Sequence, residues 1–182
     1  MKKPEVSIFR LKPHEDFAFC HPLDERDFDH LARLGDTSNM AGEGVVPEMS
    51  IFSVDEGRRL LASDAPDAGG AILVLSDHAI EVLGNLIPPN AVRRPIGNRS
   101  SGYTIVLAPV LHGAIDVDQS LVKRFDDGAI MTIDRPSFIG TRIQPLHMFR
   151  IGELRVSPTY VTDEFKKGWT TSRLRGLRFA AV

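Results

Sequence analysis

Several features that mark special classes of protein are scarce in this sequence of 182 residues. The single cysteine, Cys20, excludes an internal disulfide and gives no sign of an oxidising compartment. No apolar run approaches the roughly 20 residues that a membrane-spanning helix needs. Glu5 and Arg10 interrupt the N-terminal stretch, so no signal peptide is expected. The net charge of −2 does not indicate nucleic acid or a membrane surface as a partner. We therefore expect a cytoplasmic protein.

The sequence does contain enough apolar material for one domain. Hydrophobic residues make up 42% of the chain and charged residues 25%, which is typical of a globular protein that needs no metal or disulfide. We predict a single domain over residues 1–182, with a loosely organised N-terminal part, residues 1–70, and a main core, residues 71–182. Residues 1–91 carry 8 basic and 16 acidic side chains, whereas residues 92–182 carry 14 and 8. This uneven charge can steer a charged partner if the two halves form separate surfaces.

The C-terminal stretch gives the clearest structural pattern. Thr162 is suited to cap a helix, and two acidic residues follow in the first turn, where the helix dipole favours negative charge. Phe165 and Trp169 share one face of that helix. Gly176 ends it, and the alternating residues from Leu177 onward predict a last strand. A helix that runs directly into a strand must pack back on the sheet that contains the strand.

The rest of the chain predicts an α+β fold, with a mainly antiparallel sheet in its C-terminal half and helices packed on it. Ser76 caps a predicted helix whose buried stripe is Ala79, Val82, Leu83 and Leu86. Residues 93–102 read as a basic loop. Strands are expected over residues 6–11, 71–75, 103–111, 128–134, 138–143 and 146–151.

A helix from Asp24 to Leu34 is also expected, with Phe28, Leu31 and Leu34 on one side. Asp24 is its predicted N-cap. Residues 14–22 look irregular, with Phe17 and Phe19 as anchors.

Four acidic residues are the candidate contacts for a partner. Glu25 and Asp29 lie four apart, on the solvent side of the predicted helix. Asp55 and Glu56 fall in a stretch, residues 55–61, that reads as a turn of helix. All four are expected to be exposed, and Glu25 and Asp29 are expected to be free for a partner.

Two other constellations suggest alternative functions. His112, Asp116 and Asp118 follow a predicted strand and could gather at its end, where a histidine and carboxylates perform acid–base chemistry in a small hydrolase. Asp116 and Asp118 more often cap a turn before Ser120. The basic stretch from Arg93 to Arg99 suggests an anion-binding regulatory domain. The spacing of the histidines matches no compact metal-ligand pattern, and no cofactor is expected.

The order of several segments resembles the immunity proteins of bacterial polymorphic toxin systems, in particular immunity-protein family eleven, formerly a domain of unknown function. The likeness covers about residues 70–182. Its segments, in order, are "VLSDHAIEVLGNLIPP" followed by "RRP", "YTIVLAPVLHGAIDVDQS" with Asp116, Asp118 and Ser120, "GAIMTIDRPSF", the Phe149-Arg150 pair of "LHMFR", and "VSPTYVTDEFKKGWTTSRLRGLRF".

The resemblance implies a cytoplasmic inhibitor that binds and neutralises a cognate toxin domain by protein–protein contact. Such a protein needs no active site, so the resemblance supplies no catalytic residue. It implies no direct contact with nucleic acid or membrane, and it leaves open whether the chain forms a homodimer. On this hypothesis Glu25, Asp29, Asp55 and Glu56 contribute to the toxin-binding surface, because toxins that act on nucleic acids tend to have basic clefts.

Overall fold

The computed structural model describes residues 7–39, 41–69, 71–97, 102–143 and 146–182. These residues form a mixed α/β fold in which strands predominate and almost all strand pairs are antiparallel. The predicted α+β class is confirmed at this level.

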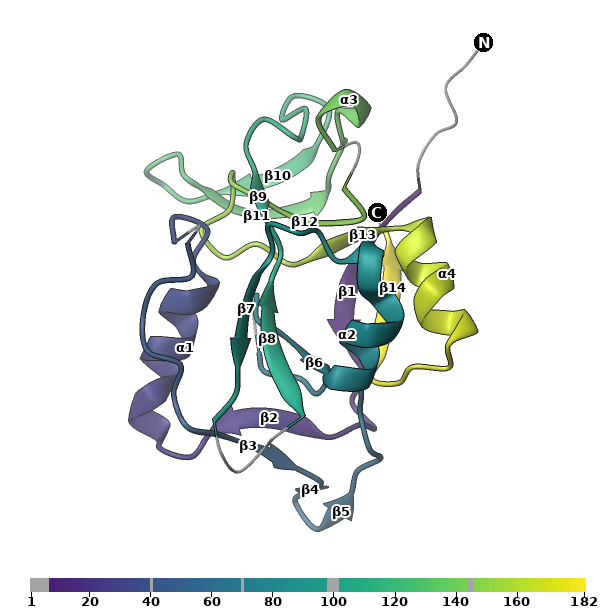
Figure 1. The fold of residues 1–182 in the computed structure, drawn as a ribbon. Coiled ribbons are helices and arrows are strands. Elements are labelled where there is room, and N and C mark those ends of the chain that lie inside the picture. Colours follow the sequence, from purple (N-terminus) through teal and green to yellow (C-terminus); the bar gives the residue numbers. More distant parts are fainter. Residues whose placement is uncertain (1–6, 40, 70, 98–101, 144–145) are drawn as a thin grey trace.

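A five-stranded sheet forms the centre of the fold (Figure 1). Adjacent strands of this sheet run antiparallel, except for the last pair, β12 and β9, which run parallel. β1 comes from the N-terminal part of the chain, yet it lies between β13 and β14, where Arg10 pairs with Tyr160 on one side and Ala180 on the other. The strand order is β14 (Leu177–Ala181), β1 (Ile8–Pro13), β13 (Tyr160–Thr162), β12 (Met148–Ile151) and β9 (Val110–Leu111).

A second, three-stranded sheet and three two-stranded ribbons complete the strands. The three-stranded sheet has the order β6 (Leu73–Ser76), β8 (Tyr103–Leu107) and β7 (Val92–Pro95). The ribbons pair β2 (Phe19–Pro22) with β3 (Met49–Phe52), β4 (Val54–Asp55) with β5 (Arg58–Arg59), and β10 (Leu121–Arg124) with β11 (Ile130–Arg135).

Two helices cover one face of the five-stranded sheet (Figure 1). α2 (Asp77–Leu83) begins at the predicted cap, where the Ser76 hydroxyl accepts a hydrogen bond from the Ala79 amide at 3.1 Å. α4 (Asp163–Thr171) packs beside it and leads into β14, as predicted. Thr162 stands at the N-cap position of α4, but its hydroxyl bonds to His147 Nδ1 at 3.0 Å and makes no cap bond.

Three hydrophobic cores are stacked through the molecule. The central core lies between the five-stranded sheet, α2, α4 and one face of the three-stranded sheet, and it contains Phe165 and Trp169. A second core lies between the opposite face of the five-stranded sheet and the β10–β11 ribbon, around Phe149 and Tyr160. The third lies between the three-stranded sheet, the β2–β3 ribbon and α1 (Phe28–Gly35), around Leu34.

Several sequence-based boundaries are wrong. Residues 93–95, predicted to lie at the start of a loop, belong to β7 (Val92–Pro95), whose backbone pairs with β8. Residues 140–143, predicted to be strand, form the short helix α3 (Gly140–Ile143). Residues 55–61 contain the β4–β5 ribbon and its turn, so the predicted helical turn is absent there. The predicted strand over residues 103–111 breaks after Leu107, so that β8 and β9 belong to different sheets.

Two predicted helix faces also need correction. α1 follows a 3₁₀ turn, Glu25–Asp27, and its buried residues are Leu31, Leu34 and Gly35, while Phe28 is 41% exposed. α2 ends at Leu83 and leaves Val82 at the surface.

Arg150 on β12 links three distant parts of the chain. Its side chain is 1% exposed, its Nε donates to the Ala108 carbonyl at 3.0 Å, and its Nη1 donates to the Gly35 carbonyl at 2.9 Å. Burial lowers the pKa of the guanidinium, and nearby Asp36 opposes that shift. The end of α1 and the break between β8 and β9 are thereby fastened to the five-stranded sheet.

Two glycines allow close approaches that a side chain would obstruct. At Gly176, where φ is +110°, an added Cβ would lie 2.0 Å from Ser63 Oγ and 2.9 Å from the Ala65 carbonyl oxygen. At Gly168, inside α4, it would lie 2.7 Å from Leu86 Cδ1. The mid-helix glycine thus serves the contact of α4 with the segment that follows α2.

Candidate functional site

The four candidate acidic residues are exposed, as the sequence predicts. Glu25 lies in the 3₁₀ turn and Asp29 in the first turn of α1, whereas Asp55 and Glu56 lie in the β4–β5 ribbon and its turn. Among the described residues, no hydrogen bond or ion pair engages these four carboxylates.

The acidic residues next to them are already engaged. Asp24 accepts from the Arg26 amide at 2.9 Å and from its Nε at 3.0 Å, and Arg26 lowers the pKa of the Asp24 carboxyl. Asp27 lies 3.2 Å from His30 Nδ1. Asp24 and Asp27 are therefore paired locally, whereas Glu25 and Asp29 remain free.

A row of aromatic side chains lies between the two acidic pairs. Antiparallel pairing places Phe19 opposite Phe52 and His21 opposite Ser50, so these side chains share the outer face of the β2–β3 ribbon. The ring of Phe28, at the start of α1, meets His21 with 5.3 Å between centroids. We call Phe19, His21, Phe28 and Phe52 together the aromatic ribbon face.

Sequence patterns alone do not predict this face, because residues 14–22 look irregular and Phe28 has the spacing of a core residue. A signal was present: Phe19 and His21 are two residues apart, the spacing that puts side chains on one side of a strand. The exposure of Phe28 carries no comparable signal, because its spacing from Leu31 matches a buried helix stripe.

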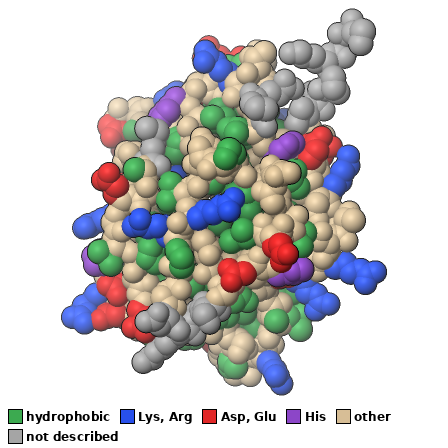
Figure 2. Space-filling view, viewed as in Figure 1, with side chains coloured by type: hydrophobic (Ala, Val, Ile, Leu, Met, Phe, Trp, Pro, Cys, Tyr) green, Lys and Arg blue, Asp and Glu red, His purple; other side chains and the backbone are tan. Residues whose placement is uncertain are grey.

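Charges of both signs are interspersed on the face of the molecule drawn in Figure 2. On that face, the unequal charge of the two halves of the chain does not produce separate acidic and basic areas. Hydrophobic side chains are also exposed at the lower end of the view, where Figure 1 places β2 to β5. Exposed side chains of these segments include Leu23 at 44%, Val54 at 55% and Leu61 at 54%.

His112, Asp116 and Asp118 do not form a hydrogen-bonded group in the described part of the chain. Asp116 Oδ1 accepts from the amides of Asp118 and Gln119, at 3.1 and 3.2 Å, and so caps a turn. His112 is exposed and lies against Gly152, where an added Cβ would be 2.2 Å from its Nδ1. The turn-capping interpretation of Asp116 is confirmed.

The predicted basic cluster is divided by the geometry of β7. Successive side chains of a strand point to opposite faces, so Arg93 and Arg94 diverge. Arg94 Nη2 donates to the Gly44 carbonyl at 2.7 Å. Arg99 lies outside the described residues.

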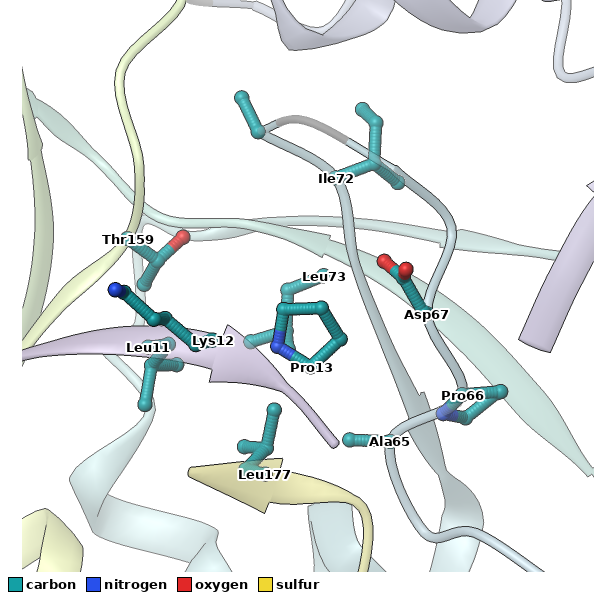
Figure 3. Close-up of a pocket in the computed structure, with 11 residues that line it drawn as sticks. Leu11, Lys12, Pro13, Ala65, Pro66, Asp67, Ile72, Leu73, Thr159 and Leu177 are labelled. Carbon is teal, nitrogen blue, oxygen red and sulfur yellow. The ribbon is translucent and has the colours of Figure 1, made fainter. Parts of the chain in front are cut away.

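A small cavity opens between the end of β1 and residues 65–67 and 71–73 (Figure 3). Figure 3 shows Lys12 beside Thr159 on one side and Asp67 on the other, with Leu73 and Leu177 among the apolar lining. Its volume of about 50 Å³ accommodates a few water molecules, whereas small-molecule sites usually measure roughly 300–1,000 Å³.

Other chemical signals within the described residues are few. No group of three or more histidine, cysteine, aspartate or glutamate side chains is arranged to hold a metal ion there. Cys20 lies on the inner face of β2, and burial raises the pKa of its thiol to about 12, so the thiol stays protonated at neutral pH. None of the helices in this part of the chain has the length and apolar character needed to cross a bilayer.

No family model matches the chain, and no curated protein matches it.

Proposed function

We propose that this protein is a cytoplasmic immunity protein that binds a cognate bacterial toxin domain and neutralises it by protein–protein contact. The observation that carries the proposal is the exposure of Glu25, Asp29, Asp55 and Glu56, whose carboxylates have no partner among the described residues. The ordered segments that resemble immunity-protein family eleven support the same function. The inhibitor acts by covering a surface of the toxin, and no chemical step is required of it.

Unpaired surface acids favour a partner with a basic surface. Such charges accelerate association with an oppositely charged protein, and this effect weakens as salt rises. The acids that are paired internally, such as Asp24, contribute less to this attraction because Arg26 neutralises the local field. We therefore expect Glu25 and Asp29 to influence mainly the rate at which the toxin is bound.

The test is protection in a co-expression assay. The toxin domain encoded by the reading frame next to this gene is expressed with the wild-type protein or with the Glu25→Lys/Asp29→Lys variant. The charge reversal is expected to slow association and to reduce survival. A matched control, Asp118→Lys/Asp126→Lys, changes the net charge equally at exposed positions near the β10–β11 ribbon and is expected to protect normally. Failure of the wild-type protein to bind or protect would remove the proposal.

A further inference from the structure

The β2–β3 ribbon carries apolar side chains on both of its faces, although only one face belongs to a hydrophobic core. Cys20 and Met49 point inward and are 0% exposed in the third core. Phe19 and Phe52 point the other way, are half-buried, and belong to none of the three cores, while Phe28 is 41% exposed. A sheet face that contacts only solvent is usually polar, so paired aromatic residues on such a face indicate a contact surface.

The rings of the aromatic ribbon face form a continuous row. Phe52 and Phe19 are stacked, with 5.2 Å between centroids and planes 12° apart. Phe19 and His21 are 4.7 Å apart, and His21 meets Phe28 edge-on at 5.3 Å. Because each ring is held by its neighbour, a partner that binds the row would immobilise few additional side chains, which lowers the entropic cost of binding.

The free charges at the two ends of the row are mostly acidic. Glu25 and Asp29 flank Phe28 in the sequence, and Asp55 and Glu56 follow Phe52 closely. Two basic side chains of the same segments are engaged, since Arg26 pairs with Asp24 and Arg58 pairs with Asp16 at 3.0 Å. For the exposed side chains of Arg33, on α1, and Arg59 the described residues provide no ion pair, so the four free acids outnumber the free bases.

We propose that the aromatic ribbon face binds a basic protein surface, with arginine side chains of the partner stacked on its rings and paired with the acids at either end. A guanidinium over an aromatic face is attracted to the π electrons, and aromatic residues are enriched among those that dominate interface energies. The inference rests on the proposed function, and it names the contact surface and the chemistry that the toxin must present.

Charge argues against a second copy of the chain as the occupant. A symmetric dimer through this face would bring the same acidic side chains of both copies toward one another. Like charges held close at an interface oppose association, whereas a basic partner gains from every one of them. The geometry therefore favours a cationic protein.

The chemistry can be tested without the toxin. Acetylated, amidated hexa-arginine is titrated into the isotope-labelled protein at low salt, and backbone amide shifts are followed by NMR, with hexa-glutamate as the control peptide. The shifts are expected to concentrate at the aromatic ribbon face. Phe28→Ala should weaken hexa-arginine binding by about two- to fivefold, the range expected for an exposed cation–π contact. Phe52→Leu, which keeps an apolar side chain but loses the π face, should act in the same direction.

The matched control is Phe125→Ala, which removes a 54% exposed phenylalanine just beyond β10 and should leave binding unchanged. Shifts that map elsewhere, or equal affinities for Phe28→Ala and Phe125→Ala, would overturn the assignment. So would dimerisation of the wild-type protein that Phe28→Ala abolishes.

The co-expression assay separates this inference from the function on which it rests. If the wild-type protein and Phe28→Ala protect equally well against the toxin, the immunity function stands and the assignment of the aromatic ribbon face as the toxin-binding surface is wrong. If the wild-type protein does not protect while hexa-arginine still binds at the rings, the surface stands and the toxin assignment fails.

Discussion

Replacing Arg150 by methionine tests whether the buried guanidinium holds the fold together. Methionine retains an unbranched apolar stem but donates no hydrogen bond, so the carbonyls of Ala108 and Gly35 lose the donors that lie 3.0 and 2.9 Å away. Hydrogen bonds from a charged donor contribute roughly 1.5–3 kcal/mol each. Relief from burying a charge offsets part of this loss. We expect the free energy of unfolding to fall by about 2–4 kcal/mol.

Urea denaturation measures this loss, and the protein carries its own reporter. Trp169 is 3% exposed in the central core, so its fluorescence changes when the core opens. The urea midpoint should fall while the m value stays constant, because the surface exposed on unfolding is almost unchanged. Arg155→Met is the matched control. That arginine side chain is 88% exposed and pairs with Asp36 at 2.8 Å, so its loss should lower the free energy of unfolding by less than about 1 kcal/mol.

A result in the opposite direction is physically reasonable and would refute the argument. Buried ionic groups can be replaced by apolar residues with a gain in stability when the charge is poorly compensated. If Arg150→Met is as stable as the wild-type protein, or no less stable than Arg155→Met, the two carbonyls find other partners and the arginine does not fasten the layers.

Three further substitutions have distinct expected outcomes. Gly176→Ala should lower the free energy of unfolding by about 2–4 kcal/mol in the same urea assay. The backbone conformation at this position is strained for alanine, and the Ala65 carbonyl oxygen would lie 2.9 Å from the new Cβ. A variant as stable as the wild-type protein would contradict this expectation. Gly168→Ala should change the free energy of unfolding by less than about 1 kcal/mol, since the gain in helix propensity is balanced by displacement of the flexible end of Leu86. A larger loss of stability would mean that the Leu86 side chain cannot move. Arg155, together with hydrogen bonds from the Ser38 hydroxyl and amide, lowers the pKa of Asp36 to about 2. The stability that the Asp36 carboxylate contributes is therefore present above about pH 4 and is lost as the pH falls toward 2. Asp36→Asn should flatten the acid dependence of stability in that window, and an unchanged profile would argue against these contacts of the carboxylate.

The elements that sequence alone predicts well are those specified by local chemistry. Ser76 caps α2 with its own hydroxyl, and Phe165 and Trp169 define the buried side of α4 by their spacing. β7 was missed because its side chains are polar or only partly buried, and its identity as a strand comes from backbone pairing with β8. Phe138 to Ile143 look like a strand by composition, but Gly140 begins a short helix there.

The candidate site also has one part that the sequence predicts and one part that it does not. The exposure of Glu25 and Asp29 follows from helix periodicity and needs no tertiary information. The row of rings cannot be predicted from the sequence, because Phe19, Phe28 and Phe52 come from three elements that are brought together by strand pairing across the intervening loop.

The position of β1 affects how the protein is made. Residues 8–13 are synthesised well before either of their neighbours, β13 and β14, which follow more than 140 residues later in the chain. Until then the strand has no hydrogen-bonding partner in its sheet, and its edges are open to pairing with other nascent chains. The central sheet therefore closes only after β13 and β14 have been synthesised, and chaperones that shield an unpaired strand should matter most before that point.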